Sequence, residues 1–235
     1  MSTVIKHKSP LFIFVLGPPC SGKSTLCNAL SKFHNFAHFS IGAEMRQLTS
    51  VNPTGPAALI RPTLTAEEIA TFTGCVQANT LAPMHSTPKY VKERLFGVGA
   101  GDIETKEGVL VDGFPRDAGR WRCFTDTMKG QWKPSEGAVV VVLHVSRDVA
   151  RERYEKRARA GDEFDKRFDE HKEKIGETVM AMRHDGVSVI EVDVRKDEEI
   201  DGLVRRVESM VGWKQAVEKR NLRNSNAYSS WTSIW

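Results

Sequence analysis

The chain has 235 residues, of which 40% are hydrophobic and 27% are charged, and this composition excludes a mainly disordered chain and a collagen-like or low-complexity fibre. The length suits one large α/β domain, or one domain with a small insert. Most of the net charge of +4 comes from residues 213–235, where four basic side chains face one acidic side chain, so the nearly neutral body argues against a surface for nucleic acid.

Five short apolar segments predict β-strands. Most of them are continuous rather than alternating, which is typical of strands that are covered on both faces. They lie at 11–16, 36–39, 109–111, 139–145 and 187–192.

Helical patterns separate these strands, at 24–33, 89–96, 149–159, 166–183 and 197–211. Two local signals mark helix starts: Thr65 and Glu68 form a capping box, and Pro88 stands at a first helical position. Because strands alternate with helices, we predict an α/β fold of three layers, in which helices cover both faces of a five-stranded parallel sheet.

Three segments interrupt this alternation. Residues 52–62 contain too many prolines for a helix and open a long helical excursion. Residues 158–165 predict a short polar turn between two charged helices. The tail from residue 221 is rich in Ser and Asn and predicts a mobile extension on which Trp231 and Trp235 rest against the surface, with a docking peptide as the alternative.

Residues 17–24, Gly-Pro-Pro-Cys-Ser-Gly-Lys-Ser, fit the phosphate-binding pattern GxxxxGK[ST] between the first predicted strand and the next helix. Glycines let backbone N–H groups point at phosphate oxygens, and the following helix adds its positive end. Lys23 is placed to reach the β- and γ-phosphates, and the Ser24 hydroxyl to hold Mg²⁺ directly or through water. We predict that a nucleoside triphosphate or a similar polyphosphate binds to Gly17, Pro18, Pro19, Cys20, Ser21, Gly22, Lys23, Ser24 and Thr25.

The third predicted strand ends in Asp112 and continues as Gly113-Phe114-Pro115-Arg116. A carboxylate at the carboxyl end of a parallel strand lies on the side of the sheet where ligands bind. There it can hold the water shell of Mg²⁺. The sharp turn after it presents Arg116 to the same crevice.

Asp-Gly-Phe-Pro-Arg after a GPPxSGK loop resembles the adenylate kinase family, the nucleoside monophosphate (NMP) kinases, over most of residues 11–211. The resemblance implies a P-loop NTPase fold over 1–212, with an NMP-binding insert at about 40–96, a short lid at about 158–166, and a basic, aromatic tail at 213–235. It implies Mg²⁺-dependent, reversible transfer of the ATP γ-phosphoryl group to an NMP.

Smaller landmarks extend this resemblance. Residues 40–46, Ser-Ile-Gly-Ala-Glu-Met-Arg, resemble the family's monophosphate-side motif, and residues 166–168, Lys-Arg-Phe, resemble the motif after the lid. Arg153 and Arg157, one helical turn apart, resemble the paired arginines at the base of the lid. A solvated helix in which these arginines pair with Glu152 and Glu155 is the alternative.

The resemblance assigns a role to each of these residues. It implies that the transferring group is stabilised by Lys23, Arg116, Arg153, Arg157 and Arg167. It implies that the acceptor contacts Ser40, Ile41, Arg46, Gly113, Arg116 and Arg120, with Ser24 and Asp112 organising the metal.

The departures from the family pattern fall on acceptor recognition. Ala43 replaces the family's Asp, Ile41 replaces its Thr, and Arg120 stands where adenylate kinases carry Gln and pyrimidine kinases Asn. A guanidinium offers five donors and no acceptor, so it cannot reproduce the hydrogen-bond pattern of an amide. The acceptor base therefore stays open between an adenylate kinase and a UMP/CMP kinase, and a non-catalytic nucleotide sensor or scaffold is a further alternative.

The four cysteines are isolated and lack metal-binding spacing, which predicts a reducing compartment and no structural metal. The longest apolar runs are far shorter than the roughly 20 residues that cross a bilayer. We therefore expect a monomeric, cytoplasmic enzyme. Its expected partners are ATP and an NMP, with no membrane or nucleic-acid partner.

Overall fold

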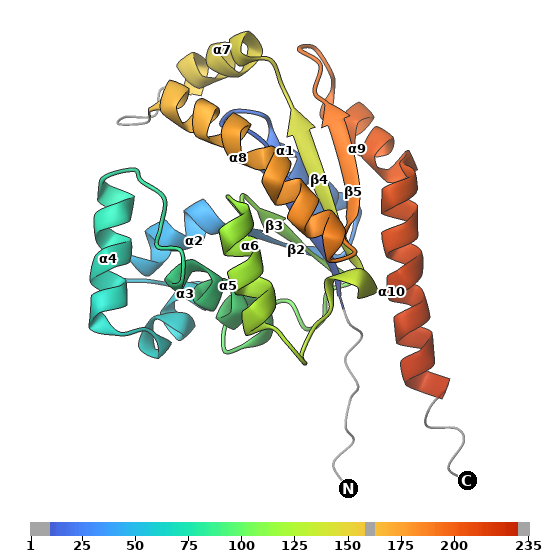
Figure 1. The fold of residues 1–235 in the computed structure, drawn as a ribbon, viewed down its shortest axis with the longest axis horizontal. Helices are drawn as coiled ribbons and strands as arrows, with labels where there is room; N and C mark the ends of the chain where they lie inside the picture. The colour runs from blue at the N-terminus through green and yellow to red at the C-terminus, as the bar shows by residue number, and fades with distance from the viewer. Residues whose placement is uncertain (1–9, 158–162, 230–235) are drawn as a thin grey trace, which may run out of the picture.

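The computed structural model describes residues 10–157 and 163–229, with side chains described as far as Leu222. In this part of the chain, five strands form one parallel sheet in the order β2-β3-β1-β4-β5 (Figure 1). The strands are β1 (Leu11–Leu16), β2 (Phe36–Ser40), β3 (Gly108–Asp112), β4 (Ala138–His144) and β5 (Ser188–Asp193). The predicted α/β fold with a five-stranded parallel sheet is therefore confirmed.

Each central strand contributes alternate residues to the two faces of the sheet, because side chains alternate along a strand. Phe12 and Phe14 of β1 belong to one apolar cluster, whereas Ile13 and Val15 belong to the other. Helices α1 (Lys23–Phe33), α9 (Ile200–Ser209) and α10 (Val211–Ser229) cover the second cluster. Burial on both faces explains why these strands are continuous apolar runs.

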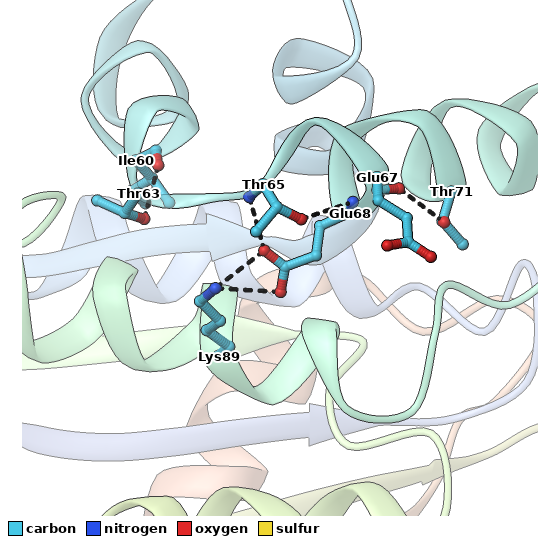
Figure 2. Close-up of polar contacts among 7 residues, drawn as sticks. All are labelled: Ile60, Thr63, Thr65, Glu67, Glu68, Thr71 and Lys89. Atoms are coloured by element: carbon cyan, nitrogen blue, oxygen red, sulfur yellow. Dashed lines mark hydrogen bonds and ion pairs between the residues drawn. The ribbon is translucent and has the colours of Figure 1, made fainter.

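The other face carries a group of helices that come after β2 and before β4 in the chain (Figure 1). They are α2 (Ile41–Leu48), α3 (Gly55–Ile60), α4 (Ala66–Gln77), α5 (Ser86–Phe96) and α6 (Ala118–Thr127). Figure 2 shows the predicted capping box of α4: the Glu68 backbone N–H donates to Thr65 Oγ1 at 3.1 Å, and the Thr65 N–H donates to Glu68 Oε2 at 2.8 Å. Lys89 of α5 also pairs with Glu68, at 2.9 Å, and so ties the start of α4 to α5.

Two predictions about proline in this region are wrong. Residues 52–62 do contain a helix, α3, which is followed by a 3-10 turn at Arg61–Thr63. Pro56 lies in the first turn of α3, where a backbone N–H has no partner within the helix, so its missing donor costs nothing there. Pro88 was predicted at the first position of its helix, but α5 starts at Ser86. Pro88 therefore lies within the first turn of α5, where a backbone N–H also has no partner in the helix.

Helices α7 (Arg147–Arg157) and α8 (Phe164–His184) follow β4, and α8 crosses the face of the sheet that holds α6 (Figure 1). Residues 158–162, which make up most of the predicted lid and turn, lie outside the described residues. Phe164 and Asp165 belong to α8 rather than to a turn.

The tail is not separate from the core at residue 213, and the described part of it is not an extension. Residues 211–229 form α10, whose Trp213 and Ala216 belong to the apolar cluster of α1 and α9. Apolar side chains that recur at helical spacing bury one face of α10 against the sheet. Trp231 and Trp235 lie outside the described residues. Within the described part of the chain, no helix has both the length and the apolar character to cross a membrane.

Candidate active site

The phosphate-binding loop connects β1 to α1 at the carboxyl edge of the sheet. Gly17 is crowded: a Cβ atom there would lie 2.7 Å from Ser21 Oγ and 2.9 Å from the Leu143 carbonyl oxygen. Gly22 has a φ of 94°, in the left-handed region that glycine adopts most readily. The tight curl of the loop therefore requires glycine at these two positions.

Lys23 lies folded back on this loop. Its Nζ donates to the carbonyl oxygens of Gly17 at 2.9 Å and Pro18 at 2.7 Å. Both acceptors are neutral and belong to the phosphate-binding loop itself. The ammonium group is thus held within the loop.

Ser24 and Asp112 come together from distant parts of the sequence. The Ser24 hydroxyl donates to Asp112 Oδ2 at 2.5 Å. Burial acts to raise the pKa of Asp112, but hydrogen bonds from His38 and Ser24 and the charge of Lys23 outweigh it and hold this pKa below its ordinary value. The carboxylate is therefore ionised at neutral pH, beside a hydroxyl oxygen.

Three cations converge beside this carboxylate. Burial, and then the charge of Arg116, lower the pKa of Lys23 to about 8. Burial, and then the charge of Arg167, lower the pKa of Arg116 to about 10. Lys23 and Arg116 are only partly covered, so crowding of like charges contributes to both shifts. The site is short of negative charge as it stands, and an anion that enters it relieves the repulsion.

Two cavities meet at these cations. The first, of about 600 Å³, is bounded by most of the predicted site: Pro19, Cys20, Ser21, Gly22, Lys23, Ser24, Thr25, Ser40, Ile41, Arg46, Asp112, Gly113, Arg116, Arg153, Arg157 and Arg167. The second, of about 320 Å³, is bounded by Ile41, Arg46, Gly113, Arg116, Arg120 and Arg167 among others. Gly17 and Pro18 line neither cavity and contribute their carbonyl groups to Lys23.

Arg120 is held in place on the wall of the second cavity. Arg120 is only 7% exposed. Its guanidinium pairs with Asp117 and donates to the carbonyl oxygen of Ala82. Asp117 is in turn the N-cap of α6, because its Oδ1 accepts the Arg120 backbone N–H at 2.8 Å. The unusual arginine is thus fixed by the same residue that starts its helix.

Among the described residues, no ion pair joins Arg153 or Arg157 to Glu152 or Glu155. Glu152 pairs with Lys156 at 2.8 Å and with Lys196 at 2.9 Å. Arg153 instead donates to the carbonyl oxygens of Arg195 and Lys196, at 3.4 Å each. Arg153 and Arg157 both border the first cavity.

Sequence reasoning missed the role of Glu44. Its carboxylate accepts from Tyr90 Oη at 2.6 Å and from Arg94 Nε at 3.2 Å. Arg94, only 2% exposed, also pairs with Asp102 at 2.8 Å. Glu44 thereby joins α2, which carries Arg46, to α5. The exchange of the family's Asp for Ala43 was noticed, but no sequence signal shows that the neighbouring carboxylate reaches Tyr90 and Arg94.

His171 of α8 was also missed. Burial, and then the charges of Lys23 and Arg116, lower the pKa of His171 to about 3. The imidazole is therefore neutral at any ordinary pH, so it adds no further charge to a site that is already crowded with cations. Its place in a charged helical pattern gave no hint of this position.

These features define a class of protein. A parallel sheet whose first strand runs into a phosphate-binding loop, with a carboxylate at the end of the neighbouring strand β3, is the fold and site of a P-loop NTPase. Residues 16–175 match the protein family described as AAA domain. The match covers more than half of the chain, so the chain belongs to this family.

Curated relatives are more specific than this family description, because they are named as kinases of nucleotides. The chain is 29% identical to an adenylate kinase of Corynebacterium diphtheriae over 180 residues, which are 77% of this chain and 88% of that protein. It is 23% identical to human UMP-CMP kinase over 183 residues, which are 78% of this chain and 83% of that protein. These relatives confirm the predicted resemblance to the adenylate kinase family of NMP kinases.

Some relatives are much longer than this chain. It is 29% identical to mouse adenylate kinase isoenzyme 5 over 150 residues, which are 63% of this chain. The chain spans about a fifth of the length of this isoenzyme, 23% of the mouse protein and 18% of the human one.

Proposed function

We propose that this protein is an ATP-dependent NMP kinase, which transfers the γ-phosphoryl group of ATP reversibly to an NMP. The donor phosphates occupy the larger cavity along the phosphate-binding loop, and the acceptor occupies the smaller cavity beside Arg46 and Arg120. The relatives named as adenylate kinases and a UMP-CMP kinase support this assignment of the reaction.

The observation that carries the proposal is the cationic cluster shared by the two cavities. Arg116 and Arg167 line both cavities, and Lys23 lines the larger one. Phosphoryl transfer between two nucleotides gathers negative charge at one place, so its catalysis is mainly positioning and electrostatic stabilisation. Lys23, Arg116, Arg153, Arg157 and Arg167 are the proposed catalytic residues. The acceptor oxygen of an NMP is already ionised near neutral pH, so no strong general base is needed.

Ser24 and Asp112 fit a Mg²⁺ ion. Mg²⁺ prefers oxygen ligands and keeps several waters, and these two residues place a hydroxyl and an ionised carboxylate 2.5 Å apart on the wall of the donor cavity. A Mg²⁺ ion held by these residues would neutralise part of the charge on the ATP phosphates. We propose Ser24 and Asp112 as the residues that hold it, directly or through water.

Arg120 supports a preference among acceptor bases. It offers donors only, and its position on the wall of the acceptor cavity suits a base that presents carbonyl oxygens, such as uracil or guanine. An adenylate kinase reaction, ATP + AMP giving two ADP, and a UMP/CMP kinase reaction are the two forms that the relatives support. A monomer that works in the cytoplasm stays a prediction.

The test is transfer of label from γ-labelled ATP to AMP, GMP, UMP, CMP and dTMP by the full chain. We expect labelled nucleoside diphosphate with at least one acceptor, and loss of transfer in Lys23→Ala. Arg122→Ala is the matched control, because the Arg122 side chain is 61% exposed and pairs on the surface with Glu177. ATP binding without transfer to any acceptor would contradict the proposal and favour a nucleotide sensor.

A further inference from the structure

We propose that Glu44 is a positioning residue for the acceptor: it fixes α2 against α5 and so holds Arg46 at the junction of the two cavities. Glu44 and Arg46 lie two residues apart on α2, and of the two only Arg46 borders the cavities. Glu44 therefore acts through Arg46 and not by contact with a nucleotide. This role rests on the proposed function, because its effect is on the affinity for the NMP.

Arg46 lies where the donor and acceptor cavities meet. It borders both of them, as does Gly42, one turn earlier in α2. A Cβ atom on Gly42 would lie 3.5 Å from Arg46 Nη1, so the guanidinium lies back along the first turn of the helix. The rotation and tilt of α2 therefore decide where this cation meets a phosphate group.

Helix α2 depends on its surroundings for this orientation. It has eight residues, and helices of this length are not stable by themselves in water. Ile41, Met45 and Leu48 are buried in the apolar cluster on this face of the sheet. Apolar contacts are not directional, so hydrogen bonds are needed to fix how α2 is turned.

Glu44 supplies hydrogen bonds of this kind. Its Oε2 accepts from Tyr90 Oη at 2.6 Å, and its Oε1 accepts from Arg94 Nε at 3.2 Å. Burial, and then the charge of Glu44, raise the pKa of Tyr90, so the hydroxyl keeps its proton and donates it to the carboxylate. Tyr90 and Arg94 lie one turn apart on α5. The carboxylate is thus fixed at two points of the neighbouring helix, through hydrogen bonds that its charge strengthens.

The partners of Glu44 are themselves held in place. Arg94 donates through Nη1 to the carbonyl oxygen of Gly99 at 2.8 Å, and it pairs with both carboxylate oxygens of Asp102 at 2.8 Å. Tyr90 is fully buried. Because these side chains have little freedom to follow a change at Glu44, we expect the loss of its carboxylate to reorient α2 rather than α5.

Glu68 provides a matched control. It also joins a helix of this group to α5, through Lys89 at 2.9 Å (Figure 2). Helix α4, which Glu68 helps to start, contains no Lys or Arg, and Glu68 borders neither cavity. Loss of Glu68 should therefore reduce stability without moving a cation of the site.

The test is steady-state kinetics of the full chain with ATP and the best acceptor from the transfer assay. Glu44→Ala should raise the KM for the NMP by about tenfold, while kcat and the KM for ATP change by less than about twofold. Glu44→Gln and Tyr90→Phe each keep part of the contact, and should give smaller rises in the same KM. Glu68→Ala should lower the melting temperature and leave the KM for the NMP within about twofold.

A double-mutant cycle shows whether the effect passes through Arg46. In Arg46→Ala the cation is already absent, so adding Glu44→Ala should raise the KM for the NMP by less than about twofold. Thermal unfolding shows which variants are folded, and Tyr90→Phe, which removes a single oxygen, replaces Glu44→Ala in the cycle if the latter does not fold.

Three results would overturn this role of Glu44. They are an unchanged KM for the NMP in Glu44→Ala, equal rises in both KM values, and a further tenfold rise when Glu44→Ala is added to Arg46→Ala. Transfer to none of the five NMPs by the unaltered chain is a separate result, because it overturns the proposed function and, with it, any role in acceptor binding.

Discussion

Lys23 and Arg116 share a property at the scale of single residues: each is a cation whose pKa is lowered by burial and by its cationic neighbours. Both causes disfavour the charged form of each side chain. A bound polyphosphate reverses this imbalance, because its negative charges favour the protonated forms. Binding of the donor and protonation of Lys23 are therefore linked.

This linkage predicts proton uptake when ATP binds. The pKa of Lys23 in the free protein is about 8, so at about pH 8.5 most Lys23 is neutral and gains a proton in the complex, whereas at about pH 7 it is already charged. Calorimetry of ATP binding in buffers of different ionisation enthalpy measures this uptake. Lys23→Arg keeps a cation that does not titrate in this range, so the additional uptake at the higher pH should disappear. Equal uptake in both proteins would contradict the assignment to Lys23.

Arg116 is predicted to act on the transferring group rather than on the fold. Arg116→Ala should lower kcat by about 1,000-fold, by analogy with other arginines that stabilise phosphoryl transfer. Steady-state kinetics of ADP formation measures the effect. Arg122→Ala, which removes an exposed arginine, should leave kcat within about twofold. A similar loss in both variants would show that charge in general, not this position, matters.

Arg120 is predicted to set the acceptor base. Replacement by Gln supplies both a donor and an acceptor, and should lower the preference for UMP over CMP by about tenfold in kcat/KM. Because Arg120 pairs with Asp117 at the start of α6, the free energy of unfolding is measured alongside. An unchanged ratio of the two kcat/KM values in a folded variant would remove Arg120 from base recognition.

The residues of the site differ in how far the sequence predicts them. Gly17 to Ser24 are contiguous, and their chemistry follows from a single loop, so the pattern was sufficient. Glu44 contacts Arg94, 50 residues away in the chain, and His38 contacts Asp112, 74 residues away. Local patterns carry no information about such contacts, because these depend on the order of the strands and on how the helices pack.

At the scale of elements, strands were easier to predict than helices. Continuous apolar runs located all five strands of the described sheet to within two residues. Helix α6 was missed, although Asp117 is a recognisable N-cap in front of it. Helix α3 was excluded by its prolines, because the prediction did not separate a first turn, which tolerates proline, from a helix interior.

Helix α10 gives a prediction at this scale. Trp213 is 6% exposed, within the apolar cluster that α1, α9 and α10 cover, so Trp213→Ala should lower the free energy of unfolding by about 3 to 5 kcal/mol. Leu222 of the same helix is 57% exposed, and Leu222→Ala should change it by less than about 0.5 kcal/mol. Urea titration measures both. Equal changes in the free energy of unfolding in the two variants would contradict the packing of α10 against the core.

At the scale of the whole molecule, the two faces of the sheet carry different parts of the structure. One face, with α1, α9 and α10, forms an apolar cluster beneath the phosphate-binding loop, while the other carries the helices that bound the acceptor cavity. The switch in strand order beside β1 opens the crevice between them. The cationic cluster lies where these two parts meet, which is the arrangement that joins a donor to an acceptor.

The most direct test of this arrangement uses a linked ligand, in which a chain of phosphates joins two nucleosides. Such a ligand fills both cavities at once if they meet at one cationic cluster, and linkage then raises its affinity above that of either half. Calorimetry should give one ligand per chain, bound at least about 100-fold more tightly than ATP, with binding blocked by ATP and also by an NMP. A linked ligand that competes with ATP alone, at the affinity of ATP, would contradict the account.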